Sequence, residues 1–353
     1  MTPSPPHRIL LMAHCLLGDS LVMIPALRAL RERFPAARVG LLSERHRRPG
    51  RIRAVEVLGG RGLVDEFHEM LVGAGRLAKG VDRLRLLCRL RRQRWDLGIV
   101  LVPPHPPATA RLLAGFGRYL RWFGARQVLL PGPVTAVRRD AQGCALPAPH
   151  VADALLGVLG PLGIAAEPGR GNGALPSRPG GFEIPAFPPG LVPVAVAPGT
   201  NMPCKRWPLE RYIAVLRDLG ATLPVHPVLF GGEGDRADCA AVLAALGRAG
   251  TLVVGEPVAR AAAIMAHCAF YLGNDTGLMH LAAALGKPCV AVFSARDLPG
   301  AWYPYGTAHR VFRTPLPCDA CFGTVCPLGT NECILRIGSE EVRQACREVG
   351  EAL

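Results

Sequence analysis

The stretch AFYLGNDTGLMHLAAALGKPCVAVF, residues 269–293, holds the pattern that decides the fold. A short apolar run, Ala269 to Leu272, leads into the small polar residues Asn274 to Gly277. Helix-forming residues follow over Leu278 to Leu285, and a second apolar run covers Pro288 to Phe293. Apolar runs on either side of such a helix are typical of parallel strands joined by a crossover helix. The stretch therefore predicts a βαβ unit of an α/β domain.

The same alternation runs through both halves of the chain. Expected strands are Arg8–Ala13, Val39–Leu42, Leu97–Val102, Val192–Ala197, Pro227–Phe230 and Leu252–Val254, and expected helices are Leu21–Phe34, Arg83–Arg94, Leu209–Leu219, Asp235–Arg248 and Ala259–His267. Between about Glu167 and Gly190 the alternation gives way to Pro, Gly and Asn, which indicates a domain boundary. A chain of 353 residues also exceeds the usual size of one core. We expect two Rossmann-like domains, residues 1–175 and 190–338, and a terminal helix over 339–353 that crosses back to the N-terminal domain.

Composition narrows the class of protein. Half of the residues are hydrophobic and 19% are charged, which argues against a disordered chain. The apolar run Ile9–Leu17 is too short to span a bilayer, and no small-residue cleavage site follows it. No other segment reaches about eighteen apolar residues without a charge. The sequence predicts a soluble cytoplasmic protein.

The formal net charge of +14 fits a phosphate-rich partner or an anionic membrane face. Two basic runs lie in the first half of the chain: Arg45, Arg47, Arg48, Arg51 and Arg53 in one, and Arg83, Arg85, Arg89, Arg91, Arg92 and Arg94 in the other. They are either solvated helix faces or an acceptor side that faces anionic lipid or phosphorylated sugar. No nucleic-acid partner is expected, because the chain has no aromatic ladder and no zinc-finger spacing.

The turn Asn274–Gly277 places small polar residues where a strand gives way to a helix. Backbone N–H groups and the positive end of the helix would then point at an anion. Asp275 can accept hydrogen bonds from sugar hydroxyls, Thr276 and Gly277 can cradle a phosphate, and His280 lies about one helical turn further on. The alternative is structural: Asp275 is a helix cap and His280 a core histidine with satisfied hydrogen bonds.

Two further strand-end loops carry groups suited to transfer chemistry. Ala197-Pro198-Gly199-Thr200-Asn201 precedes Lys205-Arg206-Trp207-Pro208, so a diphosphate could approach the backbone while Lys205 offsets charge on a leaving nucleotide diphosphate. Gly18-Asp19 follows the first strand, where a carboxylate can take a proton from an acceptor hydroxyl. The structural alternatives are a surface lysine beside a helix start and, for Asp19, a helix cap.

Together these motifs resemble glycosyltransferase family nine, the ADP-heptose:lipopolysaccharide heptosyltransferase family. The similarity covers nearly the whole chain, through Gly18-Asp19, Pro25–Leu30, Phe34-Pro35, Lys205–Pro208, Asn274–His280 and Phe293–Gly306. His14 and Cys15 stand where a small or basic residue is usual, and Ser20 replaces an apolar one, so these departures leave the acceptor open.

The resemblance implies GT-B architecture, with two Rossmann-like domains facing a central cleft. It also implies inverting transfer of a heptose or related sugar from an ADP-sugar donor to an anionic, lipopolysaccharide-core-type glycolipid or glycan, with peripheral attachment at the inner-membrane face. No cofactor is expected for transfer. The family's general base falls on Asp19 and its diphosphate-binding lysine on Lys205. Its donor contacts fall on Thr200, Asn201, Lys205, Glu233, Asp275, Thr276, Gly277 and His280.

Four cysteines near the C-terminus, Cys318, Cys321, Cys326 and Cys333, follow a C-x2-C-x4-C-x6-C spacing. Their thiolates could ligate a structural zinc ion or hold an iron–sulfur cluster. Free or redox-paired thiols are the alternative, since a cytoplasmic protein is not expected to carry a disulfide framework.

Two rival functions stay open. A sugar-nucleotide epimerase on the same fold would need a second acid/base pair near the donor sugar. A non-catalytic nucleotide-sugar-binding protein would not need Asp19, Lys205 and Asp275 together. A dinucleotide-dependent oxidoreductase is disfavoured, because no G-x-G-x-x-G follows the first strand.

Overall fold

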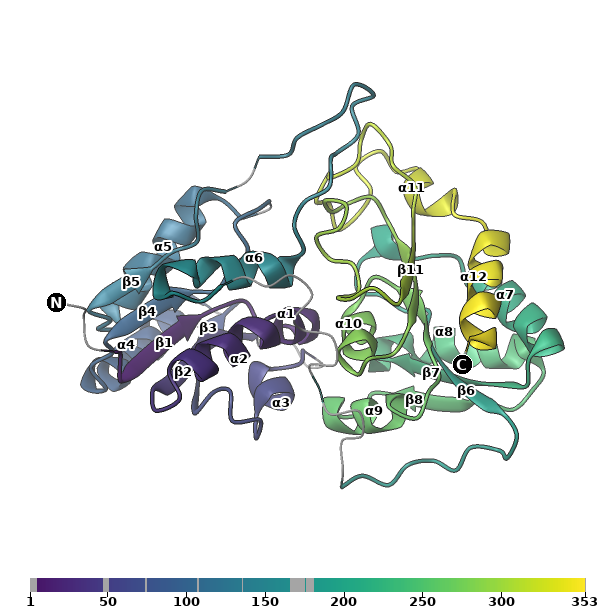
Figure 1. Cartoon of the computed structure of the whole chain (residues 1–353), viewed down its shortest axis with the longest axis horizontal. Coiled ribbons are helices and arrows are strands. Elements are labelled where there is room, and N and C mark those ends of the chain that lie inside the picture. Colours follow the sequence, from purple (N-terminus) through teal and green to yellow (C-terminus); the bar gives the residue numbers. More distant parts are fainter. Residues whose placement is uncertain are drawn as a thin grey trace. The chain divides into compact units, whose positions relative to one another are not determined.

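The computed structural model describes residues 5–46, 51–73, 75–106, 108–134, 136–165, 175 and 181–352. The chain divides into two compact units: unit 1 is Met1–Ala136 with Val151–Arg170, and unit 2 is Val137–His150 with Gly171–Leu353. Each unit is built on one sheet of parallel strands flanked by helices (Figure 1). Within the described ranges, no helix is both long enough and apolar enough to cross a bilayer.

Unit 1 has a five-stranded sheet in the order β3-β2-β1-β4-β5. Its strands are β1 (Arg8–Met12), β2 (Arg38–His46), β3 (Glu66–Val72), β4 (Leu97–Val100) and β5 (Gln127–Leu129). Its helices are α1 (Leu17–Val22), α2 (Ile24–Arg33), α3 (Ala54–Leu58), α4 (Arg76–Arg92), α5 (Ala110–Trp122), α6 (Val151–Val158) and the 3-10 turn η1 (Gly160–Leu162). The strand order reverses at β1, and the carboxyl ends of strands at such a switch point are where α/β sheets bind ligands.

The helix expected over Leu21–Phe34 is divided in the structure. α1 ends at Val22 and α2 begins at Ile24, with Met23 between them and Pro25 in the first turn of α2. Proline has no N–H and its ring clashes with the preceding turn, so it favours a helix start over a helix interior.

Unit 2 has a six-stranded sheet in the order β11-β10-β9-β6-β7-β8. Its strands are β6 (Val192–Ala197), β7 (Val225–Gly231), β8 (Thr251–Val254), β9 (Tyr271–Asn274), β10 (Cys289–Phe293) and β11 (His309–Arg313). Its helices are α7 (Leu209–Thr222), α8 (Arg236–Leu246), α9 (Val258–Met265), α10 (Gly277–Ala284), α11 (Glu332–Leu335) and α12 (Ser339–Glu351), with 3-10 turns η2 (Pro203–Lys205) and η3 (Glu233–Asp235). The expected βαβ unit over residues 269–293 is confirmed as β9-α10-β10.

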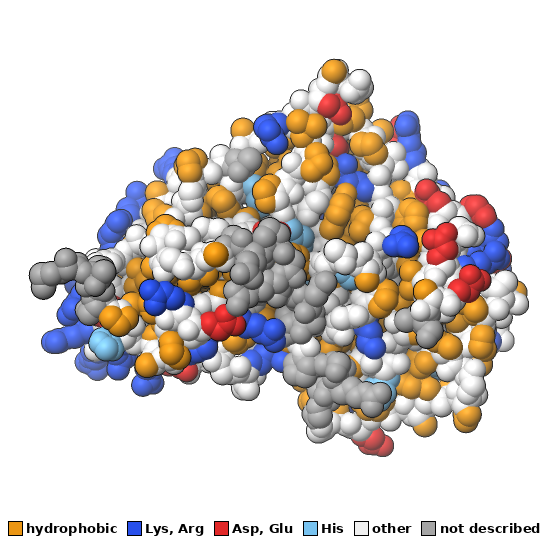
Figure 2. All heavy atoms as spheres, in the orientation of Figure 1, with side chains coloured by type: hydrophobic (Ala, Val, Ile, Leu, Met, Phe, Trp, Pro, Cys, Tyr) orange, Lys and Arg blue, Asp and Glu red, His pale blue; other side chains and the backbone are white. Residues whose placement is uncertain are grey.

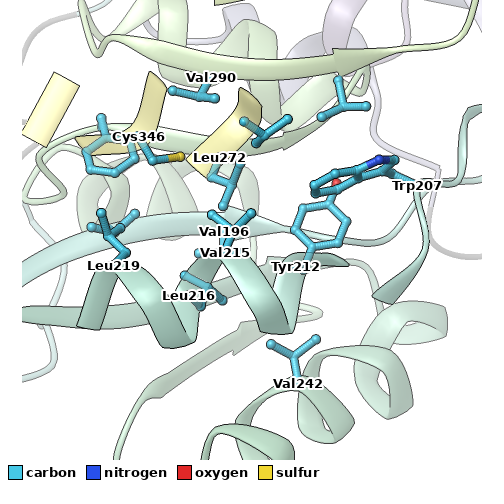
Figure 3. Close-up of a cluster of buried hydrophobic side chains, with 14 of the residues drawn as sticks. Val196, Trp207, Tyr212, Val215, Leu216, Leu219, Val242, Leu272, Val290 and Cys346 are labelled. Atoms are coloured by element: carbon cyan, nitrogen blue, oxygen red, sulfur yellow. The ribbon is translucent and has the colours of Figure 1, made fainter. Parts of the chain in front are cut away.

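The core of unit 2 lies between this sheet and α7 (Figure 3). Val196, Leu272 and Val290 project from neighbouring strands toward the Tyr212 side chain of α7, and all four are fully buried. Cys346 of α12 closes the same core and is also fully buried. Burial of large apolar side chains, at about 1.5–3 kcal/mol each, holds the sheet rigid beneath its loops.

The terminal helix α12, expected to cross back to the N-terminal domain, is grouped with unit 2. Its apolar stripe joins the unit 2 core, and Asp218 of α7 accepts hydrogen bonds at 2.7 Å from both Arg343 and Arg347. The unit 2 core therefore covers the apolar stripe of this helix.

The segment Val137–His150 also belongs to unit 2, although it precedes α6 of unit 1. The fully buried Asp319 carboxylate holds it, because it accepts hydrogen bonds from Ala145 N at 2.7 Å and Arg139 at 3.2 Å. The other Asp319 oxygen accepts from Arg313 at 2.9 Å. The Glu167–Gly173 part of the expected linker lies outside the described residues.

Candidate active site

A group of buried charges lies at the carboxyl edge of the unit 2 sheet. β6, β9 and β10 are neighbours, so the loops that follow them meet at one edge. Lys205 Nζ, after β6, lies 2.5 Å from the Asp275 carboxylate, after β9, and 3.4 Å from the Asp297 carboxylate, after β10. Arg296 lies 2.5 Å from Asp297. We call these four residues the charge cluster.

The charge cluster pairs two cations with two anions, and each side chain in it is 10% exposed or less. Burial alone lowers the pKa of Lys205, but the carboxylates of Asp275 and Asp297 outweigh it, so this pKa lies above its usual value. Lys205 is therefore a buried, permanently charged ammonium held by two carboxylates. The structural alternatives, a surface lysine and a helix cap at Asp275, do not describe this arrangement.

Asp297 and Arg296 were missed by the sequence analysis. They follow β10, a strand that was expected, as the third and fourth residues after it, whereas Asp275 directly follows β9. The signal that could have found them is that neighbouring parallel strands end at one edge. The pairing of Asp297 with Lys205, which lies far earlier in the chain, depends on the strand order and is not visible in local sequence.

Asn274 joins the two loops that sequence analysis selected. Its side chain is fully buried, donates from Nδ2 to Pro198 O at 2.7 Å, and accepts from Trp207 N at 3.3 Å. Tyr271 supports the same turn by donating to Asn274 O at 3.0 Å. The loops after β6 and β9 are thus fixed against each other, as the expected donor site requires.

Three buried polar atoms near this edge have no hydrogen-bond partner: Thr276 Oγ1, His280 Nδ1 and Ser294 Oγ. Thr276 is the N-cap residue of α10, yet its side chain makes no capping bond. Since a buried unsatisfied polar atom costs about 1–3 kcal/mol, atoms of this kind at one sheet edge indicate groups that a ligand satisfies.

His280 is buried in α10, with its ring edge-on to Trp302 at 5.9 Å. Burial lowers the pKa of His280 to about 3. The ring is therefore neutral near pH 7, and it can serve a ligand as a hydrogen-bond partner but not as a cation. The core histidine with satisfied hydrogen bonds, the structural alternative, does not describe it, because Nδ1 lacks a partner.

Three other residues expected to contact the donor, Thr200, Asn201 and Glu233, are not part of the charge cluster. Thr200 is buried and its hydroxyl accepts from Met202 N at 3.2 Å, whereas Asn201 is exposed. Glu233 is 69% exposed and makes two hydrogen bonds with Arg236, which lower the pKa of its carboxyl. In this arrangement Glu233 is engaged by its neighbour three residues on and is not joined to the charge cluster.

In unit 1, Asp19 lies near the carboxyl end of β1. Its Oδ2 accepts a hydrogen bond from Leu16 N at 3.1 Å, so it does act as a helix-cap residue of α1. Nearby, the His14 ring lies 3.3 Å from the Glu44 carboxylate, and this hydrogen bond raises the pKa of His14. His14 and Glu44 line a recess of about 10 Å³ at the ends of β1 and β2. The structure thus places two further ionisable groups beside the expected base.

The four cysteines near the C-terminus are free thiols: Cys318 and Cys321 are exposed, and Cys326 and Cys333 are half-buried. As arranged, no three Cys, His, Asp or Glu side chains in the described part of the chain could together hold a metal ion. Backbone N–H groups of residues 328–331 point at the Cys326 sulfur and lower the pKa of this thiol.

The loop between these cysteines is tied to the charge cluster. Arg296 donates to Gly323 O at 2.7 Å and to Phe322 O at 3.0 Å, while Cys204, next to Lys205, donates to Gly323 O at 3.2 Å. The cysteine loop therefore holds Arg296 directly and Lys205 through its neighbour Cys204.

Solved structures identify the fold. A glycosyltransferase family 9 structure from Veillonella parvula matches with a TM-score of 0.68 and 20% identity, covering 97% of both chains. The structure of E. coli ADP-heptose lps heptosyltransferase II matches with a TM-score of 0.63 and 18% identity, covering 97% of this chain and 98% of that one. The two parallel-sheet units are those of the GT-B fold.

Sequence comparison identifies the family. The model of glycosyltransferase family 9 (heptosyltransferase) matches residues 190–331, which contain the charge cluster. Lipopolysaccharide heptosyltransferase 2 of Escherichia coli (strain K12) is 26% identical over 326 residues, which are 87% of this chain and 88% of that protein. The chain is thus a glycosyltransferase whose residues 190–331 match family 9, the family that its motifs predicted.

Proposed function

We propose that this chain transfers a heptose, or a closely related sugar, from an ADP-sugar to a lipopolysaccharide-core-type acceptor. The observation that carries the donor half of this proposal is the charge cluster with Thr276 Oγ1 and His280 Nδ1 beside it. A buried lysine held between two carboxylates next to unsatisfied polar atoms is suited to an incoming diphosphate and sugar.

When the donor binds, Lys205 would exchange its carboxylate partners for the donor diphosphate. An incoming diphosphate competes with Asp275 and Asp297 for Lys205, whose ammonium is charged over the whole physiological pH range. The N–H groups at the start of α10 add a positive field for the same anion. Asp275, once released, can accept from hydroxyls of the sugar. Lys205 then offsets charge on the departing ADP, where a dry environment makes this interaction strongest.

The acceptor half rests on unit 1. We assign Asp19 as the base that takes the proton of the acceptor hydroxyl while this oxygen attacks the anomeric carbon. The sugar–phosphate bond breaks on the opposite face, ADP leaves, and the anomeric configuration inverts. His14 and Glu44, which form an ion pair near Asp19, would bind polar groups of an anionic acceptor. Transfer in this scheme needs no metal.

The heptosyltransferases that match this chain support both substrates. One solved structure is named for ADP-heptose and lps, and the curated relative is named for lipopolysaccharide. An acceptor of this kind is made at the inner face of the inner membrane, so we assign the protein to the cytoplasm with peripheral contact at that membrane. The four cysteines are free thiols that do not converge on a metal site among the described residues, and metal analysis of the purified protein tests whether zinc or an iron–sulfur cluster gathers them.

The donor is tested by thermal denaturation of the full chain with ADP-, GDP-, UDP- and TDP-sugars. ADP-heptose should raise the melting temperature, and Lys205→Met should lose most of that shift, because the diphosphate then has no buried cation. Lys287→Met, a lysine of the same unit outside the charge cluster, is the matched control and should keep it. A larger shift with another nucleotide, or an equal shift in Lys205→Met, would overturn the donor assignment.

A further inference from the structure

The outward side of α4 in unit 1 carries an apolar stripe. Leu77, Val81, Leu84 and Cys88 recur at intervals of four, three and four residues, which places them on one helix face. Leu77 is 83% exposed and Leu84 60% exposed. Exposed aliphatic side chains in such a row indicate a surface made for contact with something apolar.

The core contact of α4 uses the opposite side of the helix. Leu86 and Leu90 are buried in the unit 1 core, half a turn around from Leu84 and Cys88. The helix therefore has two apolar stripes, and only one of them is needed for folding. A surface helix of a monomeric domain ordinarily has a polar outer face.

Basic side chains flank the exposed stripe on both sides. Arg91 lies along one side of it, and Arg85 and Arg92 lie along the other, all three exposed. Among the described residues none of the three makes an ion pair or a side-chain hydrogen bond. The one acidic residue of α4, Asp82, pairs with Arg45 at 3.1 Å and is 20% exposed, so it does not neutralise this side.

Helix α5 continues the same surface. The Arg83 guanidinium of α4 lies 5.5 Å from the centre of the Tyr119 ring of α5, so the two helices are neighbours. α5 adds Trp122, 42% exposed, and the exposed Arg118 and Arg121. We call the outward sides of the two helices the α4–α5 face.

Most of the excess charge of the chain lies in the segment that contains these two helices. Residues 76–126 hold twelve Lys and Arg against two Asp, a net charge of +10 out of +14 for the whole chain. Lys and Arg side chains gather at the left edge of Figure 2, where α4 and α5 lie in Figure 1.

We propose that the α4–α5 face docks on an anionic lipid bilayer, with Leu77, Val81 and Leu84 entering the headgroup layer. A helix with a row of aliphatic residues flanked by arginines is the usual form of an interfacial helix, and a tryptophan beside it suits the boundary between headgroups and acyl chains. Arg85, Arg91 and Arg92 then pair with lipid phosphates.

Two other occupants fit the face less well. A second copy of the chain, docked by the same face around a two-fold axis, would bring arginines against arginines. Single-stranded RNA would satisfy the arginines, but it takes stacking aromatic residues, and the stripe on α4 is aliphatic.

Docking would hold the enzyme at the membrane, where the proposed reaction takes place. This link to the reaction is the one part of the docking proposal that rests on the proposed function. A lipid-anchored acceptor lies in the membrane plane, so an enzyme held there by unit 1 meets it by lateral diffusion. The vesicle measurement below uses no sugar donor, so either proposal can fail without the other.

The test is sedimentation of the full chain with vesicles of phosphatidylglycerol and phosphatidylethanolamine, against pure phosphatidylcholine, at about 0.15 M salt. The chain should bind the anionic vesicles and not the neutral ones. Each arginine near an anionic surface contributes about fivefold to binding, so Arg85→Gln/Arg91→Gln/Arg92→Gln should lose on the order of 100-fold. Leu77→Gln/Leu84→Gln should lose at least about tenfold.

Matched changes on unit 2 are the controls. Leu328→Gln alters a leucine that is 62% exposed, and Arg217→Gln/Arg336→Gln alters basic side chains away from the α4–α5 face, so both should bind vesicles as the unaltered chain does. Equal binding to neutral vesicles, or equal losses in the control variants, would overturn the proposal. If Leu77→Gln/Leu84→Gln bound vesicles as well as the unaltered chain, these leucines would not enter the bilayer. If the same change broke a dimer, the occupant of the face would be a second copy of the chain. If RNA bound more tightly than vesicles, the occupant would be RNA.

Discussion

The ion pair between Lys205 and Asp275 gives the most quantitative prediction about stability. Lys205→Met removes the ammonium and leaves the carboxylates of Asp275 and Asp297, 4% and 10% exposed, with Arg296 as the one cation of the charge cluster that remains. Breaking a buried ion pair from one side costs about 3–5 kcal/mol, because a buried charge loses its partner. We expect Lys205→Met to destabilise unit 2 by about 3 kcal/mol.

Asp275→Asn should cost less, about 2 kcal/mol, because Lys205 keeps Asp297 at 3.4 Å. The double variant Lys205→Met/Asp275→Asn removes one cation and one anion together and leaves the Arg296–Asp297 pair in place. Its loss should fall short of the sum of the single losses by about 2 kcal/mol, which is the coupling between the two side chains.

Hydrogen exchange followed by mass spectrometry is the suitable assay, since a chain of two units does not guarantee two-state unfolding. Peptides from β9, α10 and β10 report on unit 2, and peptides from β1 and β4 serve as the internal reference in unit 1. Additive losses, within about 0.5 kcal/mol, would refute the reasoning. So would a loss below about 1 kcal/mol in Lys205→Met, because the pair would then behave as a solvated one.

Three further predictions concern other sites. Asp19→Asn should reduce transfer by at least about 100-fold, as loss of a general base does, while ADP binding measured by calorimetry stays within about twofold; full activity would remove Asp19 as the base. His280 stays neutral in the folded chain down to a pKa of about 3, whereas the unfolded chain binds a proton below about pH 6.5, so stability is lost as pH falls between these values. Urea titrations should show that His280→Gln loses about 2.5 kcal/mol less than the parent chain between about pH 6 and pH 4, and an equal loss would mean that His280 is not buried as a neutral ring. Asp319→Asn should destabilise unit 2 by about 3 kcal/mol and expose residues 137–150 to proteolysis, because Arg313 and Arg139 lose their buried carboxylate; an unchanged proteolytic pattern would contradict this.

The sequence could predict those parts of the molecule that depend on local pattern. The βαβ unit at residues 269–293 follows from apolar runs, small turn residues and a helix of fixed length, and the structure has it as β9-α10-β10. The apolar stripe of α12 is equally local, but the core that receives it, here that of unit 2, depends on tertiary packing that no local pattern encodes. The division of the expected helix at Met23 could have been predicted from Pro25.

The candidate site shows the same limit. Lys205 and Asp275 were selected from loops at strand ends, yet their direct pairing follows from the adjacency of β6 and β9, which no local pattern encodes. Asp297 was missed for the same reason. Its role depends on β10 lying next to β9, so the strand order brings all three side chains to one point.

The central claim is sugar transfer, and it is tested most directly by incubating the purified chain with ADP-heptose and a lipopolysaccharide core that lacks heptose. Mass spectrometry should find the acceptor heavier by one heptose for each ADP released, and NMR of the product should find the anomeric configuration inverted. ADP release without a heavier acceptor, an epimerised donor, or an unchanged donor under conditions where ADP-heptose binds would each contradict the account.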